Sequence, residues 1–328
     1  MTDAGIEIVE YRAAFRTELV DLWGRLFAGR RHFRPLDRAT WVREIERSGF
    51  DPCGLRVAFH GDRVIGFAHG GVWQGDFLRH YRPHFVGDRL PYLAMVGVAP
   101  EMRRRGVGRA LVSALATTFG ARVEPDGRMF NPFYGNSAAP RPPLWGTTEG
   151  AAVPIDDAAA RGFFRALGFA EVAEAHSQLL NLTAAARTVA TGPSAADVEI
   201  ISERDYLPAL GTSTGRTFGE TNVSRTWIAV EGTVQRAALV AYPFATPAAG
   251  ADWAIYSLEV EPAARGRGLG TVLLRAFLRE LREELQARTV ETLVIPAESP
   301  AALRLYTAHG FESVARWIVL GAAGVDGS

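Results

Sequence analysis

The chain has 328 residues with a formal net charge of zero, 48% hydrophobic and 22% charged residues, which is typical of a globular protein of about two domains. The balanced charge disfavours a nucleic-acid partner, because binding to a phosphate backbone requires a basic surface. All 36 basic residues are arginine and Cys53 is the single cysteine, so a Schiff-base lysine, a P-loop lysine, an internal disulfide and a thiolate metal cluster are excluded.

The N-terminal residues 1–7 have neither the basic nor the apolar segment of a secretory signal. Apolar runs stay shorter than the roughly 18 residues that a membrane helix needs. We therefore expect a cytoplasmic protein without a membrane partner.

Hydrophobic periodicity predicts a short strand over residues 6–11 and helices over residues 13–28 and 38–46. Two apolar runs around Gly61-Asp62 predict a hairpin of strands over residues 55–60 and 63–68. A strand over residues 92–98 follows, and the next helix, over residues 106–119, buries an apolar stripe of Val107, Leu111 and Leu115.

Residues 121–143 form a Pro-, Gly- and Asn-rich stretch that predicts a long irregular loop, and such loops are usually functional or mobile. Tyr134, Trp145 and Glu149, in and after this loop, either line an acceptor pocket or cap the core. Regular structure returns with a strand at 143–146, a helix capped by Asp156 or Asp157 that ends at Gly168, and strands over 170–175 and 178–182.

The Ala-, Thr- and Gly-rich residues 184–196 predict a linker, which divides the chain into domains 1–183 and 197–328. We call these the first and the second half. The second half repeats the plan with strands over 198–202, 253–260, 292–295 and 314–320, a hairpin of 226–230 with 237–242, a helix beginning at 204–210 and a helix over 268–287. Ser299 and Pro300 predict the start of a last helix that Gly310 ends.

Two glycine-rich segments at strand-to-helix junctions lie 162 positions apart, from Arg103 to Arg265. We call residues 103–108 (Arg-Arg-Arg-Gly-Val-Gly) the first glycine loop and residues 265–270 (Arg-Gly-Arg-Gly-Leu-Gly) the second. Glycines and the N–H groups of a following helix suit a bound phosphate. The competing interpretations are an ordinary glycine turn and a dinucleotide-binding turn, and the antiparallel hairpin before each loop disfavours the latter.

Both halves resemble the GNAT superfamily of acyl-CoA-dependent N-acyltransferases. Its motif of Arg or Gln, two residues, Gly, one residue and then Gly or Ala is matched by both glycine loops. A later helix in the family carries a tyrosine four residues before a closing Gly-Phe, as Tyr306 stands before Gly310-Phe311. The first half has Phe164 at that place. The resemblance covers nearly the whole chain and implies an α+β fold of two tandem GNAT-like domains, each a mixed, mostly antiparallel sheet flanked by helices.

The resemblance implies acetyl-CoA as cosubstrate and an amine, either a small molecule or a peptide, as acceptor. It places CoA-binding residues in both halves. These are Val98, Arg103, Arg104, Arg105, Gly106, Val107 and Gly108 in the first half, and Val260, Arg265, Gly266, Arg267, Gly268, Leu269, Gly270 and Ser299 in the second. Arg104 and Arg105 either reach phosphates or belong to a solvated face.

Two residues of the second half are candidates for catalysis. Tyr306 is the expected general acid for the leaving thiolate, or else a helix tyrosine that packs its ring. Glu259 is the candidate base, or else a residue of a solvated strand face, in which case a water chain serves as base. Because Phe164 and Gly97 stand at these places in the first half, we expect that half to be catalytically silent.

A non-catalytic CoA sensor is the alternative to an enzyme, and catalysis in the first half is another. His80 and His84 have metal-ligand spacing, but Pro83 breaks the helix between them, so we expect no metal.

Overall fold

The computed structural model describes residues 5–46, 50–75, 78–79, 85–125, 144–148, 152–183, 198–204, 224–243 and 252–322. The predicted linker, most of the predicted loop at 121–143, the pair His80 and His84, and Tyr134 and Glu149 lie outside these residues. None of the described helices is long and apolar enough to cross a membrane.

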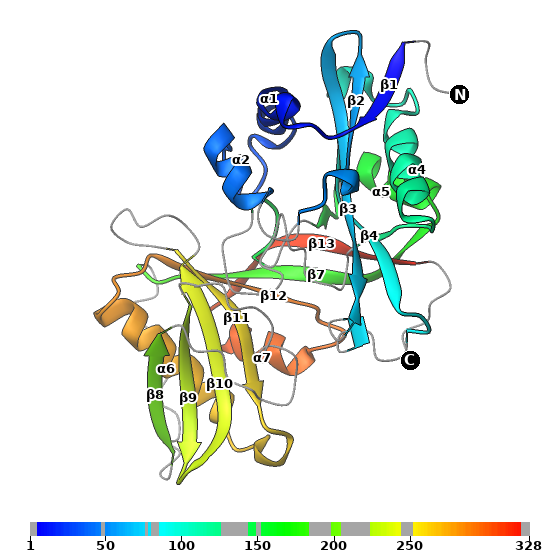
Figure 1. The fold of residues 1–328 in the computed structure, drawn as a ribbon. Helices are drawn as coiled ribbons and strands as arrows, with labels where there is room; N and C mark the ends of the chain where they lie inside the picture. Colours follow the sequence, from blue (N-terminus) through cyan, green and yellow to red (C-terminus); the bar gives the residue numbers. More distant parts are fainter. Residues whose placement is uncertain are drawn as a thin grey trace.

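The first half builds a sheet of order β1-β2-β3-β4-β5 (Figure 1). Its neighbours are antiparallel except for the parallel pair β4 and β5. The strands are β1 (Ile6–Glu10), β2 (Leu55–His60), β3 (Arg63–Gln74), β4 (Arg89–Val98) and β5 (Glu124–Pro125). The helices are α1 (Arg16–Phe27), α2 (Arg38–Glu44), α4 (Val107–Phe119) and α5 (Ala158–Ala166), with short 3₁₀ turns at Ala13–Phe15, Pro52–Gly54 and Pro100–Met102.

The second sheet has the order β6-β13-β7-β12-β11-β10-β9-β8. Its strands are β6 (Val153–Pro154), β7 (Phe169–Asn181), β8 (Glu199–Arg204), β9 (Arg225–Glu231), β10 (Val234–Pro243), β11 (Trp253–Val260), β12 (Thr289–Val294) and β13 (Glu312–Ala322). Helices α6 (Leu269–Glu283) and α7 (Pro300–Ala308) and a 3₁₀ turn at Pro262–Ala264 complete this half.

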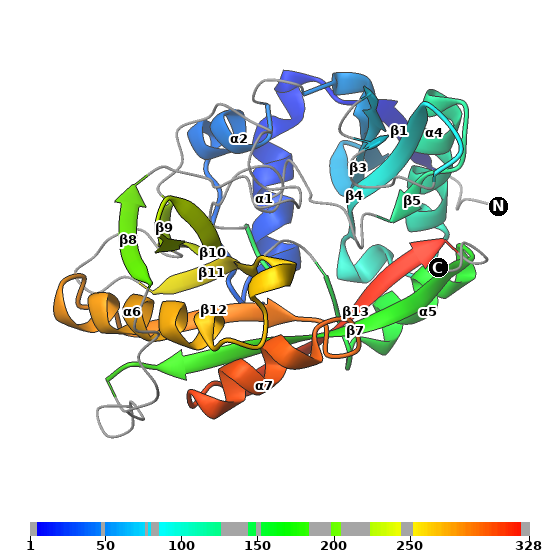
Figure 2. The same cartoon turned by 90° about the horizontal axis from the view of Figure 1, so that it is seen from below.

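Strand β7 belongs to the first half in sequence but lies within the sheet of the second half. It pairs with β12 on one side and with β13 on the other, both antiparallel. Figure 1 shows β7 and β13 side by side across the middle of the molecule, and Figure 2 shows the same pair from below, next to α7. The second sheet is therefore built from strands of both halves of the sequence.

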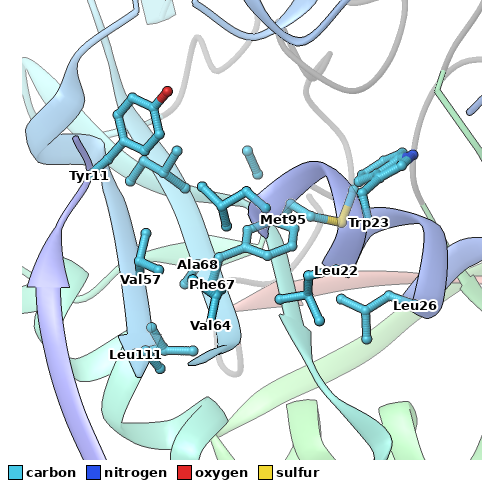
Figure 3. Close-up of a cluster of buried hydrophobic side chains, with 14 of the residues drawn as sticks. Tyr11, Leu22, Trp23, Leu26, Val57, Val64, Phe67, Ala68, Met95 and Leu111 are labelled. Atoms are coloured by element: carbon cyan, nitrogen blue, oxygen red, sulfur yellow. The ribbon is translucent and has the colours of Figure 1, made fainter. Parts of the chain in front are cut away.

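Each half buries its own core. In the first half, Leu22, Trp23 and Leu26 of α1 pack against Phe67 of β3 and Met95 of β4 (Figure 3). In the second half, a stripe of α6 packs against the sheet under Trp227, through Leu269, Leu273, Leu274, Phe277, Leu278 and Leu281. Their spacing of three and four residues is what the sequence predicts for a helix with one buried face.

Several predicted boundaries are wrong. The two strands expected at 170–175 and 178–182 are the single strand β7, because neighbours on both sides hold its whole length. The strand expected at 143–146 is irregular from Leu144 onward: Gly146 has φ +97° and donates its N–H to the carbonyl of Arg31 at 2.9 Å. Helix α6 ends at Glu283, four residues early, before a turn in which Gln286 has φ +48°. Arg204, expected to begin a helix, ends β8.

Candidate functional site

The two glycine loops have almost the same backbone. Arg103 and Arg265, the first residue of each loop, have φ and ψ of −69° and 158° and of −65° and 156°. Gly106 and Gly268, the caps of the helices that follow, both have φ +82°. The repeat in the sequence is therefore a repeat in structure.

The first arginine of each loop holds the loop to the strand before it. The Nε–H group of Arg103 donates to the carbonyl of Val98 at 3.1 Å, and that of Arg265 donates to Val260 at 3.2 Å. This bond fixes the turn between strand and helix. The arginine side chain therefore supports the loop by binding a backbone carbonyl of the preceding strand. The helix N-termini of α4 and α6 then supply N–H groups suited to an anion.

Open space lies beside two glycines of the second loop, and a side chain packs closely on the last glycine of the first. A Cβ built on Gly266 or Gly268 meets no heavy atom within 4 Å, so the second loop has open space beside its backbone. In the first loop, a Cβ on Gly108 would lie 2.9 Å from the ring of Phe163 on α5. Glycine thus serves close helix packing at Gly108 and leaves room for a ligand at Gly266 and Gly268.

Arg267 of the second loop is held by an acidic residue at the end of β9. Its Nη1 group lies 3.4 Å from a carboxylate oxygen of Glu231, which also accepts from Arg236 at 2.9 Å. Hydrogen bonds from Arg267 and then Arg236 lower the pKa of Glu231 to about 2. Arg267 is therefore a partner of this surface cluster, and the backbone N–H groups of the loop remain the main donors for an anion.

In the second half the strand before the glycine loop diverges from its parallel neighbour. β11 pairs with β12 only at Trp253↔Val290 and Ala254↔Glu291, although all of β12 is described. In the first half, β4 pairs with both residues of the short β5, at Tyr92↔Glu124 and Leu93↔Pro125. Ala94 and Tyr256 are the extra residues of two bulges at equivalent places of β4 and β11. Bulges redirect side chains and end pairing, and the bulge of β11 lies where its pairing with β12 ends.

One cavity of about 1090 Å³ is lined by residues of both halves. Residues 93–98 of β4 and 255–259 of β11 line it, as do Ala175 of β7 and Val319 of β13. We call it the central cavity. We call β7, which belongs to the first half in sequence and lies in the sheet of the second, the exchanged strand. Because residues of both halves line the cavity, neither half encloses it alone.

The sequence-predicted residues divide between the cavity and its surroundings. Tyr306, Glu259 and Ser299 line it, as do Val98, Arg103, Arg104, Gly106, Val107 and Gly108. The remaining predicted residues are outside its lining: Arg105 in the first half, and Val260, Arg265, Gly266, Arg267, Gly268, Leu269 and Gly270 in the second. The cavity thus brings the first glycine loop together with the catalytic candidates of the second half.

Tyr306 and Phe164 occupy equivalent places on α7 and α5. Tyr306 is 4% exposed and its ring lies 5.2 Å from that of Phe311, while Phe164 lies 6.1 Å from Phe169. Both rings line the central cavity. The packing is conserved between the halves, and the hydroxyl group is the difference.

Glu259 and Gly97 are the second point of contrast. Leu258 and Val260 pack against the core of the second half, so Glu259 lies on the opposite face of β11 and lines the cavity. In the first half, a Cβ on Gly97 would lie 2.5 Å from Cδ1 of Leu26 on α1. An apolar side chain therefore fills the space that a carboxylate would need.

Part of the cavity wall was not identified from the sequence. Phe27 and Arg30, at the end of α1, and Thr147 line it together with Trp145. Sequence analysis left Trp145 between an acceptor pocket and a core cap, and it stands at the cavity with its ring stacked on Phe27. Helical periodicity predicts that Phe27 is a buried position of the helix over residues 13–28, but it does not distinguish a core from a cavity wall.

Each of the two glycine loops lies in a region that matches the model of a known protein family. The model of the acetyltransferase (GNAT) family matches residues 17–124 and again residues 196–311. A search of curated protein sequences finds no match.

Solved structures match the whole chain. The chain is similar to a tandem GNAT protein from the clavulanic acid biosynthesis pathway, with 18% identity, a TM-score of 0.62, and 98% of this chain and 100% of that chain covered. It is also similar to a GCN5-related glucosamine N-acetyltransferase region of a fungal multi-domain β-N-acetylglucosaminidase, with 15% identity, a TM-score of 0.62, and 98% of this chain and 38% of that chain covered. For a GCN5-related N-acetyltransferase from Sphaerobacter thermophilus, the identity is 14% and the TM-score 0.56, with 98% of this chain and 96% of that chain covered. At these identities the likeness shows the fold alone, a tandem GNAT-like α+β fold.

Proposed function

Because the chain belongs to the acetyltransferase (GNAT) family, we propose that it transfers an acetyl group from acetyl-CoA to a primary amine, and that the second half carries out the chemistry. The observation that supports this division is the lining of the central cavity. Tyr306, Glu259 and Ser299 all reach it from the second half, whereas the equivalent places in the first half hold Phe164 and Gly97.

The second glycine loop is the proposed binding site for the pyrophosphate of CoA. The left-handed φ angles of Gly266 and Gly268 and the open space beside both residues fit a close backbone contact with an anion. Arg265 keeps the loop in this shape through its bond to Val260. Val260, Arg267, Leu269 and Gly270 complete the proposed contact surface, and Ser299 at the start of α7 borders the path from the loop into the cavity.

The diverging strands provide the next part of the site. Beyond Ala254, β11 runs along the cavity without pairing to β12, which the structure describes in full. Backbone N–H and C=O groups on such an edge suit an extended chain that carries amides, which is the form of the pantetheine arm of CoA. Bound acetyl-CoA supplies the thioester that the amine attacks.

Glu259 and Tyr306 are the proposed proton carriers. Glu259 accepts the proton that the ammonium group must lose before its nitrogen forms the new C–N bond. When the C–S bond breaks, the Tyr306 hydroxyl donates its proton to the thiolate. The nitrogen loses its second proton as the amide forms, which restores the phenol through solvent, and Glu259 releases the first proton to solvent. Both residues line the central cavity, which supports assigning the base and the acid to one reaction centre.

The first glycine loop supports a second CoA-binding site without turnover. Val98 and residues 103–108 have the same backbone form as the second loop, and most of them line the cavity directly. This direct lining also favours a second candidate function, in which the first half holds the reacting acetyl-CoA. The missing base at Gly97 and the missing hydroxyl at Phe164 weigh against it.

Thiol release from acetyl-CoA with a panel of amines tests the proposal. We expect release by the wild type, and a decrease of about a hundredfold or more in kcat for Tyr306→Phe and for Glu259→Gln, the range of general acid–base catalysis. Phe164→Tyr is the matched control and leaves kcat unchanged. Calorimetric titration of acetyl-CoA checks that binding survives in each variant.

Full activity of Tyr306→Phe together with loss of activity in Arg103→Glu would assign the chemistry to the first half. Binding of acetyl-CoA without thiol release for any amine would identify a sensor instead.

A further inference from the structure

We infer that the acceptor is an amine that also carries a carboxylate and an apolar side group, held between Glu259 of the second half and Arg30 with Trp145 of the first. This inference rests on the proposed function, since it names the substrate class of the same cavity. Free amino acids with apolar side chains are the simplest molecules of this class.

Arg30 is the first carboxylate-binding group. It follows α1, lines the central cavity, and its side chain is 39% exposed. Its Nη2 group bonds Oδ2 of Asp157 at 3.0 Å. Within the described residues this is the one hydrogen bond of the guanidinium, which therefore keeps donors for a ligand. A planar guanidinium with several N–H groups is the side chain best suited to a carboxylate.

Trp145 supplies a second donor beside it. The residue is 9% exposed and lines the cavity, and its indole Nε1 is buried without a hydrogen-bond partner in the part of the chain that the structure describes. A buried N–H group left without an acceptor keeps the cost of its desolvation. An oxygen atom of a bound ligand would satisfy it.

Backbone contacts join the segments that carry these two residues. The N–H of Gly146 donates to the carbonyl of Arg31 at 2.9 Å, and the N–H of Arg34 donates to the carbonyl of Leu144 at 2.8 Å. Trp145 and Arg30 are therefore chain neighbours of a directly bonded pair, and both residues line the central cavity.

A carboxylate of the second half also lines the cavity. Glu259 of β11 suits the ammonium group of the acceptor. The stacked rings of Phe27 and Trp145, 4.9 Å apart and inclined by 22°, present an aromatic surface for an apolar side group. A zwitterion with an apolar side group matches this pattern of charge and surface.

The first experiment compares two amines that differ in one group, phenylalanine and phenethylamine, which lacks the carboxylate. We expect kcat/KM for phenylalanine to exceed that for phenethylamine by about tenfold or more, the effect of one charged hydrogen-bonded contact. Arg30→Gln should raise KM for phenylalanine by about tenfold and leave KM for phenethylamine and both kcat values near the wild type. Trp145→Phe keeps the stack, removes the N–H group and should act in the same direction.

Arg63→Gln, at an exposed arginine of the β2–β3 turn, is the control and should change neither KM. Thermal unfolding of all variants checks that each is folded. Equal use of the two amines by the wild type, or an equal effect of Arg30→Gln on both, overturns the inference.

A binding experiment separates this inference from the proposed function. N-Acetylphenylalanine and N-acetylphenethylamine are titrated into the full chain by calorimetry, with CoA present. Tighter binding of the carboxylate compound that Arg30→Gln abolishes supports the inference even when no amine is turned over. Equal or absent binding of both compounds contradicts it, whether or not the protein acetylates other amines.

Discussion

The carboxylate of Glu291 and the guanidinium of Arg31 form an ion pair between the two halves of the chain, 260 positions apart. His32 Nε2 lies 2.9 Å from the same carboxylate, whose side chain is 4% exposed. Glu291 stands on β12 at its last pairing with β11, and Arg31 bonds the backbone beside Trp145. This buried contact therefore ties the opening of the second sheet to the cavity wall of the first half.

Removing the charge of Glu291 should destabilise the protein. In Glu291→Gln, Arg31 loses its partner in a site that is largely dry, and a broken buried pair costs about 3 kcal/mol. Urea unfolding at neutral pH measures the change. Glu283→Gln, on the exposed face of α6, is the control and should stay within about 0.5 kcal/mol of the wild type. A loss for Glu291→Gln no larger than that of the control would show that the pair is energetically neutral.

The same pair should make stability depend on acid. Burial alone would raise the pKa of the Glu291 carboxyl, but the hydrogen bond and charge of His32, followed by those of Arg31, bring it below its ordinary value of 4.5. A carboxyl with a lowered pKa stabilises the folded state above its unfolded pKa, and this contribution disappears as the pH falls through the folded pKa. The difference in unfolding free energy between wild type and Glu291→Gln should therefore be constant near neutral pH and shrink below pH 4.5. A difference that grows towards acid pH would contradict this assignment.

The two glycine loops predict opposite effects of exchanging one residue. Arg104 has φ +62° at the place where Gly266 has φ +79°. A non-glycine residue with this left-handed backbone strains the folded state by about 1–2 kcal/mol. Replacing it with glycine removes the strain, but the more flexible unfolded chain offsets about 0.5–1 kcal/mol of the gain. Arg104→Gly should thus stabilise the protein by about 0.5 kcal/mol, and Gly266→Arg should destabilise it by about as much. Thermal unfolding of both variants tests the sign, and a loss of stability in Arg104→Gly would refute the argument.

Replacing the last glycine of each loop with alanine should show how packing and helix propensity each affect the free energy of unfolding. Both Gly108 and Gly270 lie in the first turn of a helix, where alanine is favoured over glycine by about 1 kcal/mol. A Cβ at Gly270 meets Leu258 at 3.4 Å and Leu305 at 3.5 Å, which is ordinary contact, whereas a Cβ at Gly108 meets Phe163 at 2.9 Å. We expect Gly270→Ala to be neutral or stabilising and Gly108→Ala to be destabilising by about 1 kcal/mol. The ranking in chemical unfolding checks this, and equal values for the two variants would rule out the packing difference.

The exchanged strand predicts that the second half does not fold alone. A fragment of residues 184–328 lacks β7, so β12 and β13 both lose the partner between them. Two strands with open edges favour aggregation. The fragment should be insoluble or unfolded by circular dichroism, while residues 152–328, which keep β6, α5 and β7, should be the more soluble. A monomeric fragment 184–328 with cooperative unfolding would show that the second half needs no strand from the first.

Local patterns in the sequence were sufficient for most helices, strands and turns. The apolar runs of β9 and β10, the Asp157 cap of α5 and the Gly-rich turns before α4 and α6 all follow from short-range rules. The fold class and the repeat also follow from the sequence, since both glycine loops and the closing Gly-Phe recur in order. The contrast of Tyr306 with Phe164 and of Glu259 with Gly97 is visible there as well.

Contacts between the halves were beyond the reach of those rules. Nothing in residues 169–181 shows that they lie between β12 and β13, because a strand's own pattern indicates buried faces and does not name its neighbours. Nor does the spacing of residues in the sequence show that Arg30, Trp145 and Glu259 line one cavity. The sequence by itself determined the two similar halves, their glycine loops and the residues that distinguish them. Only the tertiary structure decided that both halves enclose one cavity, since strand pairing and ion pairs such as that of Arg31 with Glu291 act between residues far apart in the chain.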